Sequence, residues 1–325
     1  LGSSPEDAAS LGNDWLQSVD GFPALISDPW LNGRLTALHA SSDLWACGSS
    51  VDSAMAVITL PKTAAALQQE LLSQTLSGLR SAFQPQGARL IGGHTLEARA
   101  EAPTHLSLGL QVSLTVNGKR PAHPWKKGGL QPGDQLLLSR PLGTGVLFAA
   151  AMAGAAQPED LDHALAQMGT SQHPIVQQLQ ELINLEAKTK AKAQPSCTDV
   201  TGFGLLGHLG EMLQASSQSL QVVLDGSAIP ALPGALKLLK GQYASSLAPA
   251  NRRAWSLLDP TQGKPAKVIL SRASSGCTPE DHQAMLELLV DPQTCGPLML
   301  SCSGAMADAL LQANDTEWHH IGVVQ

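Results

Sequence analysis

Aromatic residues are scarce in this sequence, since phenylalanine, tryptophan and tyrosine together make up only 3% of its 325 residues. Charged residues are also few, at 14%, so we expect a surface of serine, glutamine and alanine with few ion pairs. The hydrophobic fraction of 43% is nevertheless ample for buried cores of leucine, valine, alanine and methionine. A chain of this length predicts about two domains.

Positive charge is in deficit as well. Lysine and arginine number 20 against 27 aspartates and glutamates, which gives a net charge of -7. Proteins bind nucleic-acid backbones through clusters of basic side chains, so nucleic acid is not expected as a partner. An acidic protein can still bind a nucleoside triphosphate where metal ions bridge the negative charges.

Long apolar runs and cysteine motifs are absent. No window reaches the roughly 18 unbroken apolar residues of a membrane helix, and no secretory signal stands at the start. The 5 cysteines are scattered, with no CxxC zinc pair and no disulfide framework. We therefore expect a cytoplasmic protein without membrane contact. Because the chain begins at Leu1 rather than methionine, we interpret it as a processed product or an excised fragment.

Alternating apolar segments predict a fold of the α/β (α+β) class, with two units in tandem. Helices are predicted at residues 28–46, 62–83, 143–155, 280–289 and 305–313, with a turn and helix at 198–216 and two more helices before residue 192. Strands are predicted at residues 14–20, 53–60, 88–95, 105–116, 135–140, 220–225, 298–301 and 320–324. The stretch 117–134 is rich in proline, glycine and lysine, which is typical of a linker. It predicts a boundary between a domain of residues 1–120 and one of residues 121–325.

Four aspartates stand where a strand or loop is expected to meet a turn: Asp7, Asp20, Asp43 and Asp199. Carboxylates are ligands suited to Mg²⁺, which proteins hold with one or two of them plus substrate phosphates. Two or more Mg²⁺ ions could bridge a triphosphate and neutralise the charge that develops during transfer. The same residues also favour helix caps and turns, so a purely structural role stays open for each one.

Two glycine-rich stretches could approach a ligand closely. The first, Gly92 to Thr95, follows an apolar strand, and we interpret it as a turn in which His94 and Thr95 supply polar contacts. It is neither a Walker A loop nor a Rossmann fingerprint. In the second, Asp199 precedes Gly202 and Gly204 at the start of a helix. Helix N-termini attract anions, and a carboxylate there would repel phosphate unless a cation lay between them, which favours metal ligation by Asp199.

The remaining polar candidates are interpreted as structural. His208 falls on a helix face, and Asp291 before Pro292 favours a turn. The paired His319 and His320 lack the spacing of a helical zinc site. The other histidines without an identifiable partner are read as non-catalytic, namely His39, His105, His123, His173 and His282.

Together these stretches resemble the selenophosphate synthetase (selenide, water dikinase) family of the aminoimidazole ribonucleotide synthetase-like superfamily. The matching segments keep the family's order and spacing over nearly the whole chain: "EDAA", "SVDGFPALISDPWLNGRLTALHASSDLWACG", "LIGGHT", "GLQPGDQLLLSRPLGTGVL", "TDVTGFGLLGHLGEM" and "LVDPQTCGPLML".

The resemblance implies a two-domain aminoimidazole ribonucleotide synthetase-like fold whose N-terminal sheet forms a barrel in a homodimer. It implies the conversion of ATP, selenide and water to selenophosphate, AMP and phosphate, with Mg²⁺ as cofactor and K⁺ as a further candidate ion. By position, the metal ligands would be Asp7, Asp20, Asp43 and Asp199. The nucleotide contacts would come from Glu6, Asp20, Asp43, Gly92, Gly93, His94 and Thr95.

The sequence also departs from the family pattern. The family's reactive cysteine or selenocysteine and its nearby lysine would precede Leu1, so no catalytic residue is assigned within this chain. The family has an aromatic residue at the position of Gly21, an asparagine at that of His39, a lysine at that of Arg140, and SGG at 295–297. Some members are fused to a flavin-dependent oxidoreductase, which makes such an N-terminal domain a candidate partner.

Two alternatives stay open. The chain could be a related superfamily kinase that phosphorylates another small nucleophile. It could also be an ATP-binding domain that has lost catalysis and serves an attached oxidoreductase. The altered residues 295–297 and His39 are the features that favour the second alternative.

Overall fold

The structure is a computed structural model that describes residues 6–12, 14–99, 109–188, 194–260, 265–271, 278–313 and 318–325. For residues 186–188 it describes the backbone alone. It divides into two compact units. We call Asp7–Pro124 with Met168–Gln177 the N-terminal unit, and the rest of the chain, Glu6 included, the C-terminal unit.

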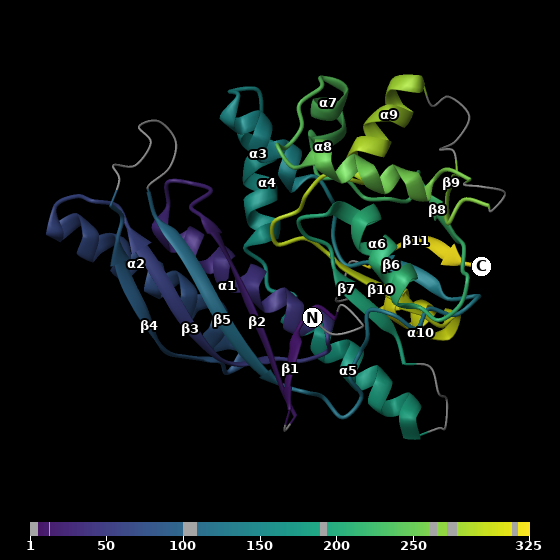
Figure 1. Ribbon diagram of the computed structural model, residues 1–325, viewed down its shortest axis with the longest axis horizontal. Coiled ribbons are helices and arrows are strands. Elements are labelled where there is room, and N and C mark those ends of the chain that lie inside the picture. The colour runs from purple at the N-terminus through teal and green to yellow at the C-terminus, as the bar shows by residue number, and fades with distance from the viewer. Residues whose placement is uncertain are drawn as a thin grey trace. The chain divides into compact units, whose positions relative to one another are not determined.

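The N-terminal unit is built on a five-stranded sheet. Its strands run in the order β1 (Ala9–Gly12), β2 (Trp15–Pro23), β5 (Gln111–Lys119), β3 (Val51–Leu60) and β4 (Arg89–Glu97). Neighbouring strands are antiparallel except for β3 and β4, which are parallel. Helices α1 (Pro29–Ala46) and α2 (Ala65–Phe83) pack against the sheet, with the short 3₁₀ helix η1 (Gln84–Gln86) after α2 (Figure 1).

The two faces of this sheet differ because side chains alternate along each strand. On β5, Val112, Leu114 and Val116 are buried. On the opposite face, Val19 of β2 and Met55 and Val57 of β3 are exposed. Among the described residues, the N-terminal unit therefore leaves an apolar sheet face exposed, which we call the open face.

Helix α1 begins as the sequence predicts. The Asp28 side chain accepts a hydrogen bond from the backbone N–H of Leu31 at 2.9 Å, and Pro29 occupies the first turn, where a missing N–H costs nothing. Helices α1 and α2 cross at two glycines. A Cβ on Gly33 would collide with the carbonyl oxygen of Thr75, and one on Gly78 with that of Trp30. Glycine at both positions thus allows backbone-to-backbone contact.

The prediction of a glycine turn at residues 92–95 is wrong. Gly92, Gly93, His94 and Thr95 lie inside strand β4, where they pair in parallel with residues 55–58 of β3. A Cβ on Gly93 would collide with the carbonyl oxygen of Ala56, so glycine here permits the close approach of two strands next to an irregularity in their register. The predicted strand 14–20 likewise continues to residue 23, which puts Asp20 within β2 rather than at its end.

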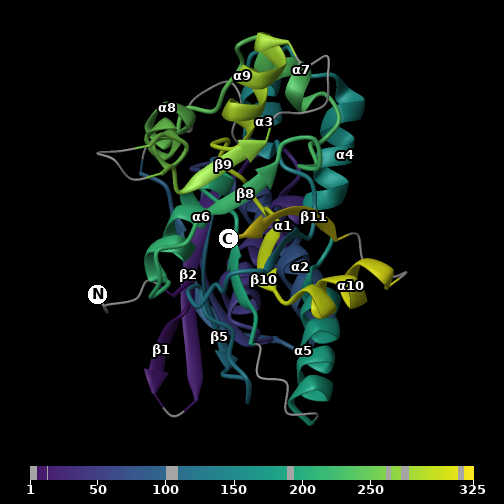
Figure 2. The ribbon, with the colours of Figure 1, turned by 90° about the vertical axis from the view of Figure 1, so that its right-hand side faces the viewer.

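The C-terminal unit contains a six-stranded sheet. Its strands run in the order β7 (Ser196–Asp199), β10 (Leu298–Cys302), β6 (Gln135–Leu138), β11 (His319–Val324), β8 (Val222–Asp225) and β9 (Val268–Ser271). All neighbours are antiparallel except β8 and β9, which lie side by side and parallel (Figure 2). Leucine, valine and methionine residues from the sheet and from the surrounding helices form its core.

The remaining helices are α3 (Thr144–Met152), α4 (Pro158–Met168), α5 (His173–Lys188), α6 (Gly204–Ala215), α7 (Ala235–Lys240), α8 (Ala248–Asn251), the 3₁₀ helix η2 (Arg252–Leu257), α9 (Pro279–Leu288) and α10 (Gly304–Gln312). The sequence did not predict β1, β7, β9, α7, α8 or η2. The predicted strand at 105–116 appears from residue 111, and its first four residues lie outside the described part. No helix in the described part of the chain has the length and apolar character needed to cross a membrane.

Candidate metal and nucleotide site

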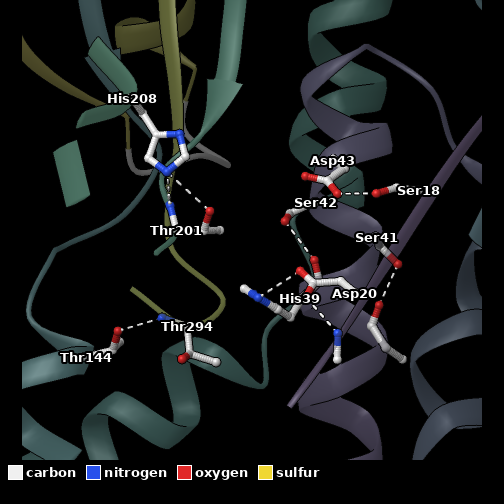
Figure 3. Close-up of polar contacts among 12 residues, drawn as sticks. Ser18, Asp20, His39, Ser41, Ser42, Asp43, Thr144, Thr201, His208 and Thr294 are labelled. Carbon is white, nitrogen blue, oxygen red and sulfur yellow. Dashed lines mark hydrogen bonds and ion pairs between the residues drawn. The ribbon is translucent and has the colours of Figure 1, made fainter. Parts of the chain in front are cut away.

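Two of the predicted metal ligands meet in the N-terminal unit. Asp43 lies in the last turns of α1, where Ser18 of β2 donates a hydrogen bond to its Oδ2 (Figure 3). Asp7 precedes β1, and each of the two carboxylates offers an oxygen within 4.8 Å of the other. Two carboxylates at this separation repel each other unless a cation lies between them. The donor set of two half-buried carboxylates fits a divalent cation of the Mg²⁺ type.

Asp20, the third predicted ligand in this unit, has a protein partner. Its Oδ2 lies 3.0 Å from Nε2 of His39 on α1, and its Oδ1 accepts from the backbone N–H of Gly21 at 2.7 Å. The ring of Phe22 packs edge-on against His39, with the ring centroids 5.4 Å apart. Burial raises the pKa of Asp20, but the hydrogen bond and charge of His39 and the Gly21 N–H outweigh it, so the pKa is lowered.

The expectation that His39 and His173 have no identifiable partner is therefore wrong. His173 Nε2 lies 2.8 Å from the Ser50 hydroxyl, and burial lowers its pKa. No sequence signal marks the His39–Asp20 pair, because its members come from a helix and a strand whose contact depends on the tertiary fold.

The predicted nucleotide-contacting residues are divided between the two units. Glu6 is exposed, and its Oε2 accepts from the backbone N–H of Lys127 at 3.0 Å in the C-terminal unit. The residues 92–95 are exposed along β4, at one edge of the five-stranded sheet.

Asp199, the fourth predicted metal ligand, is the last residue of β7 in the C-terminal unit and is buried. The next residue, Val200, donates its N–H to the carbonyl of Pro297 at 2.8 Å. A Cβ on Gly296 would collide with the carbonyl oxygen of Val200. The residues after Asp199 are thus held closely against the 295–297 segment, which includes Cys295 with a positive φ of 50°.

The segment 291–294 closes the N-terminus of α3. Gln293 Oε1 accepts from the N–H groups of Gly143 at 2.9 Å and Thr144 at 3.2 Å, and Thr294 N–H donates to the Thr144 hydroxyl at 3.0 Å (Figure 3). Gln293 Nε2 also donates to Asp291 Oδ2 at 2.9 Å. Burial raises the pKa of Asp291 to about 7, despite hydrogen bonds that oppose the shift. These contacts support the structural interpretation of Asp291.

The comparisons with known proteins identify the family. Residues 5–119 match the N-terminal domain, and residues 131–325 the C-terminal domain, of AIR synthase related proteins. A selenide, water dikinase of Desulfitobacterium hafniense is 32% identical over 92% of this chain and 76% of its own length. Another, from Nitratidesulfovibrio vulgaris, is 31% identical over 98% of this chain and 83% of its own length. The chain belongs to the selenide, water dikinase family.

Solved structures confirm the fold expected of this family. The thiamine monophosphate kinase of Aquifex aeolicus superimposes with a TM-score of 0.66 at 14% identity, over 98% of this chain and 87% of that one. The hydrogenase maturation protein HypE of E. coli gives a TM-score of 0.61 at 17% identity, over 96% and 80% of the two chains. At these identities the likeness shows the fold alone. The predicted two-domain aminoimidazole ribonucleotide synthetase-like architecture is thereby confirmed.

Proposed function

We propose that this chain carries the ATP-dependent synthesis of selenophosphate from selenide and water, with release of AMP and phosphate. The observation that carries the proposal is the Asp7–Asp43 carboxylate pair, in a chain 32% identical to a protein named selenide, water dikinase. Use of ATP is further supported by the same fold in a kinase described as complexed with the ATP analogue AMPPCP. In the described part of the chain, the buried cysteines Cys47, Cys197, Cys295 and Cys302 are thiols rather than disulfides, which supports the proposed reducing, cytoplasmic setting.

In this proposal the aspartates hold Mg²⁺ along the triphosphate. Bound Mg²⁺ would neutralise negative charge on the phosphates, and Asp7 and Asp43 would orient it, with Asp43 fixed by the Ser18 hydroxyl. Asp199 is proposed as a further ligand. Asp20 stays a proposed ligand too, because a carboxylate has about four lone-pair sites and two hydrogen bonds leave others free. Glu6 and residues 92–95 are proposed to contact the nucleotide.

The reaction balances with two transfers. Selenide attacks the γ-phosphorus, so that a selenium–phosphorus bond forms and the bond from that phosphorus to the bridging oxygen of ADP breaks. Water then attacks the β-phosphorus of the ADP, which gives phosphate and AMP. Positioning of the nucleotide and stabilisation of its charge are the protein's main contributions to such transfers.

We further propose that a second copy of the chain covers the open face of the five-stranded sheet. The exposed side chains of Val19, Met55 and Val57 make that face apolar, which is unusual for a sheet that stays in water. A homodimer is also what the family resemblance implies.

Phosphorus NMR under anaerobic conditions tests the reaction. The chain is incubated with ATP, Mg²⁺, K⁺ and selenide, and selenophosphate should appear together with AMP. Asp43→Asn should abolish both signals, whereas Asp225→Asn, which changes an exposed carboxylate at the end of β8, should leave them unchanged. A phosphorylated product from another nucleophile would instead favour a related kinase. ATP left intact in the presence of selenide and Mg²⁺ would overturn the proposal.

A further inference from the structure

Lys127 is a buried cation in the C-terminal unit for which the reaction above has no use. Only 5% of the residue is exposed. Its Nζ donates to Glu211 Oε2 at 2.9 Å, and its backbone N–H donates to Glu6 Oε2 at 3.0 Å. A buried ammonium group is costly unless it is paired, so these contacts bind Lys127 firmly to both segments.

Glu211 connects Lys127 to a histidine one turn earlier on α6. Nδ1 of His208 lies 3.4 Å from the same oxygen, Oε2, of Glu211. Nε2 of His208 accepts from the backbone N–H of Thr201 at 3.1 Å (Figure 3). An imidazole nitrogen that accepts carries no proton, so this pattern assigns the proton to Nδ1, which faces Glu211.

The charges along this chain of contacts are consistent with one another. Burial raises the pKa of Glu211, but the hydrogen bonds and charges of His208 and Lys127 outweigh it and lower the pKa to about 2. Glu211 is therefore ionised at neutral pH, between the cation of Lys127 and the Nδ1–H of His208. Among the described residues, Nδ1 of His208 has no hydrogen bond shorter than its 3.4 Å contact with Glu211, and the series ends on the main chain at Thr201.

Thr201 lies two residues after Asp199, and its carbonyl is held as well. That carbonyl accepts from the backbone N–H groups of Gln293 at 2.9 Å and Gly204 at 3.1 Å. The peptide groups on both sides of Thr201 are thus fixed by hydrogen bonds. At its other end, Lys127 holds Glu6, the residue that precedes Asp7 in the chain.

We propose that Lys127, Glu211 and His208 form a positioning relay that sets the main chain next to Asp199 for metal binding. The proposal rests on the proposed function, in which Asp199 is a metal ligand. A role in folding alone is the weaker reading, because buried ion pairs contribute little net stability compared with well-packed apolar side chains. Groups that orient metal ligands typically change metal affinity by about 10- to 100-fold when they are altered.

The test measures Mn²⁺ affinity of the full chain by electron paramagnetic resonance, with thermal unfolding recorded for every variant. Glu211→Gln, which removes the charge at constant shape, should weaken Mn²⁺ binding by about 10-fold. His208→Gln, whose amide oxygen can replace the Nε2 acceptor, should retain most of the affinity. Glu287→Gln, which removes an ion-paired carboxylate that contacts Arg252 on the same unit, should bind Mn²⁺ like the wild type.

Two results separate the possible failures. If the wild-type chain does not bind Mn²⁺ with or without ATP, the carboxylate site of the proposed function is wrong, and the relay with it. If the wild type binds and a folded Glu211→Gln binds equally well, only the relay is overturned. Nitrogen-15 NMR of the wild-type imidazoles keeps the test decisive should the variant not fold: His208 should carry its proton on Nδ1 at neutral pH, and a proton on Nε2 would overturn the relay.

Discussion

The two units bury their sheets to different extents. In the C-terminal unit every residue of β10 is buried, and β10 lies between the strands β7 and β6. In the N-terminal unit the helices cover one face only, and Val19, Met55 and Val57 are 66%, 47% and 43% exposed on the other. The difference is that the buried strand β10 has no counterpart on the open face, where apolar side chains stay exposed.

The largest expected effect is loss of the proposed dimer when charge is placed on the open face. Met55→Lys combined with Val57→Lys places two charges where a second copy is proposed to dock, and burial of unpaired charge is prohibitive. We expect the mass measured by light scattering after size exclusion to fall from that of a dimer to that of a monomer.

Leu311→Lys is the matched control, because it places a lysine at an exposed leucine of α10 in the C-terminal unit. It should leave the mass unchanged. A wild-type chain that is already monomeric at micromolar concentration would contradict the proposed dimer.

The next prediction concerns how a buried and a half-exposed carboxylate, Asp291 and Asp20, make stability depend on pH. Asp291 in the C-terminal unit has a pKa raised to about 7 by burial, so the folded state keeps a proton that the unfolded state releases above its own value of 3.8. Stability should therefore fall as pH rises from about 4 to about 7, by at most about 4 kcal/mol from this group. Urea unfolding of the wild type and of Asp291→Asn across this range measures the effect.

The difference between the two unfolding curves isolates Asp291 from the other titrating groups. We expect the variant to gain stability relative to the wild type as pH rises, because its amide cannot ionise. Parallel curves would show that Asp291 titrates at its ordinary pKa in the folded protein. Asp225→Asn should leave the slope above about pH 5 unaltered, because the pKa of Asp225 is lowered and its carboxylate is ionised there in both the folded and the unfolded state.

Asp20 in the N-terminal unit should affect the pH dependence of stability in the opposite direction to Asp291. Its lowered pKa contributes stability that is present above the unfolded value of 3.8 and is lost as pH falls through the folded value. His39 lowers the pKa of Asp20, whereas burial raises it. His39→Asn removes the first influence and leaves the second, so the pKa of Asp20 should rise. Its side chain is 34% exposed, so water screens the pair and we expect a loss of only about 1 kcal/mol at pH 7.

Carbon-13 NMR of the aspartate carboxyl groups measures this shift directly. The substitution introduces the asparagine that the family resemblance places at this position. An unchanged titration of Asp20 in His39→Asn would show that the Gly21 N–H alone sets its pKa.

Local rules were enough to predict much of the fold from the sequence. Asp28 and Pro29 mark the start of α1, and the period-two alternation of 111–116 marks β5, because capping and strand patterning depend only on neighbours in the chain. The turn at Gly92–Thr95 was misplaced since glycines normally interrupt strands, and here the pairing with β3 overrides that preference. Strand β7 was missed because Ser196–Asp199 carries no apolar alternation and is buried by its neighbours.

The sequence motifs suggested the candidate carboxylates, whereas no sequence signal suggested most of their protein partners. Asp7 and Asp43 were chosen from motifs, and the fold brings them together. The His39–Asp20 pair joins a helix to a strand, and Lys127 reaches Glu211 across 84 residues, so no spacing could have revealed either. The three-residue spacing of His208 and Glu211 on α6 was the one available signal, since such residues share a helix face.

The smallest expected effect concerns an exposed pair, Lys240 and Asp281, in the C-terminal unit. Lys240 and the cap residue Thr278 hold the pKa of Asp281 well below its usual range. The low pKa does not imply a large contribution to folding, because water screens exposed charges and the lysine loses side-chain freedom in the pair. We expect Lys240→Met to shift the unfolding temperature by less than about 2 °C.

Thr278→Ala, which removes the N-cap of α9, should lower the unfolding temperature more, because capping hydrogen bonds satisfy backbone N–H groups that no ion pair replaces. Calorimetry of the two variants side by side decides whether the cap or the ion pair stabilises this helix start.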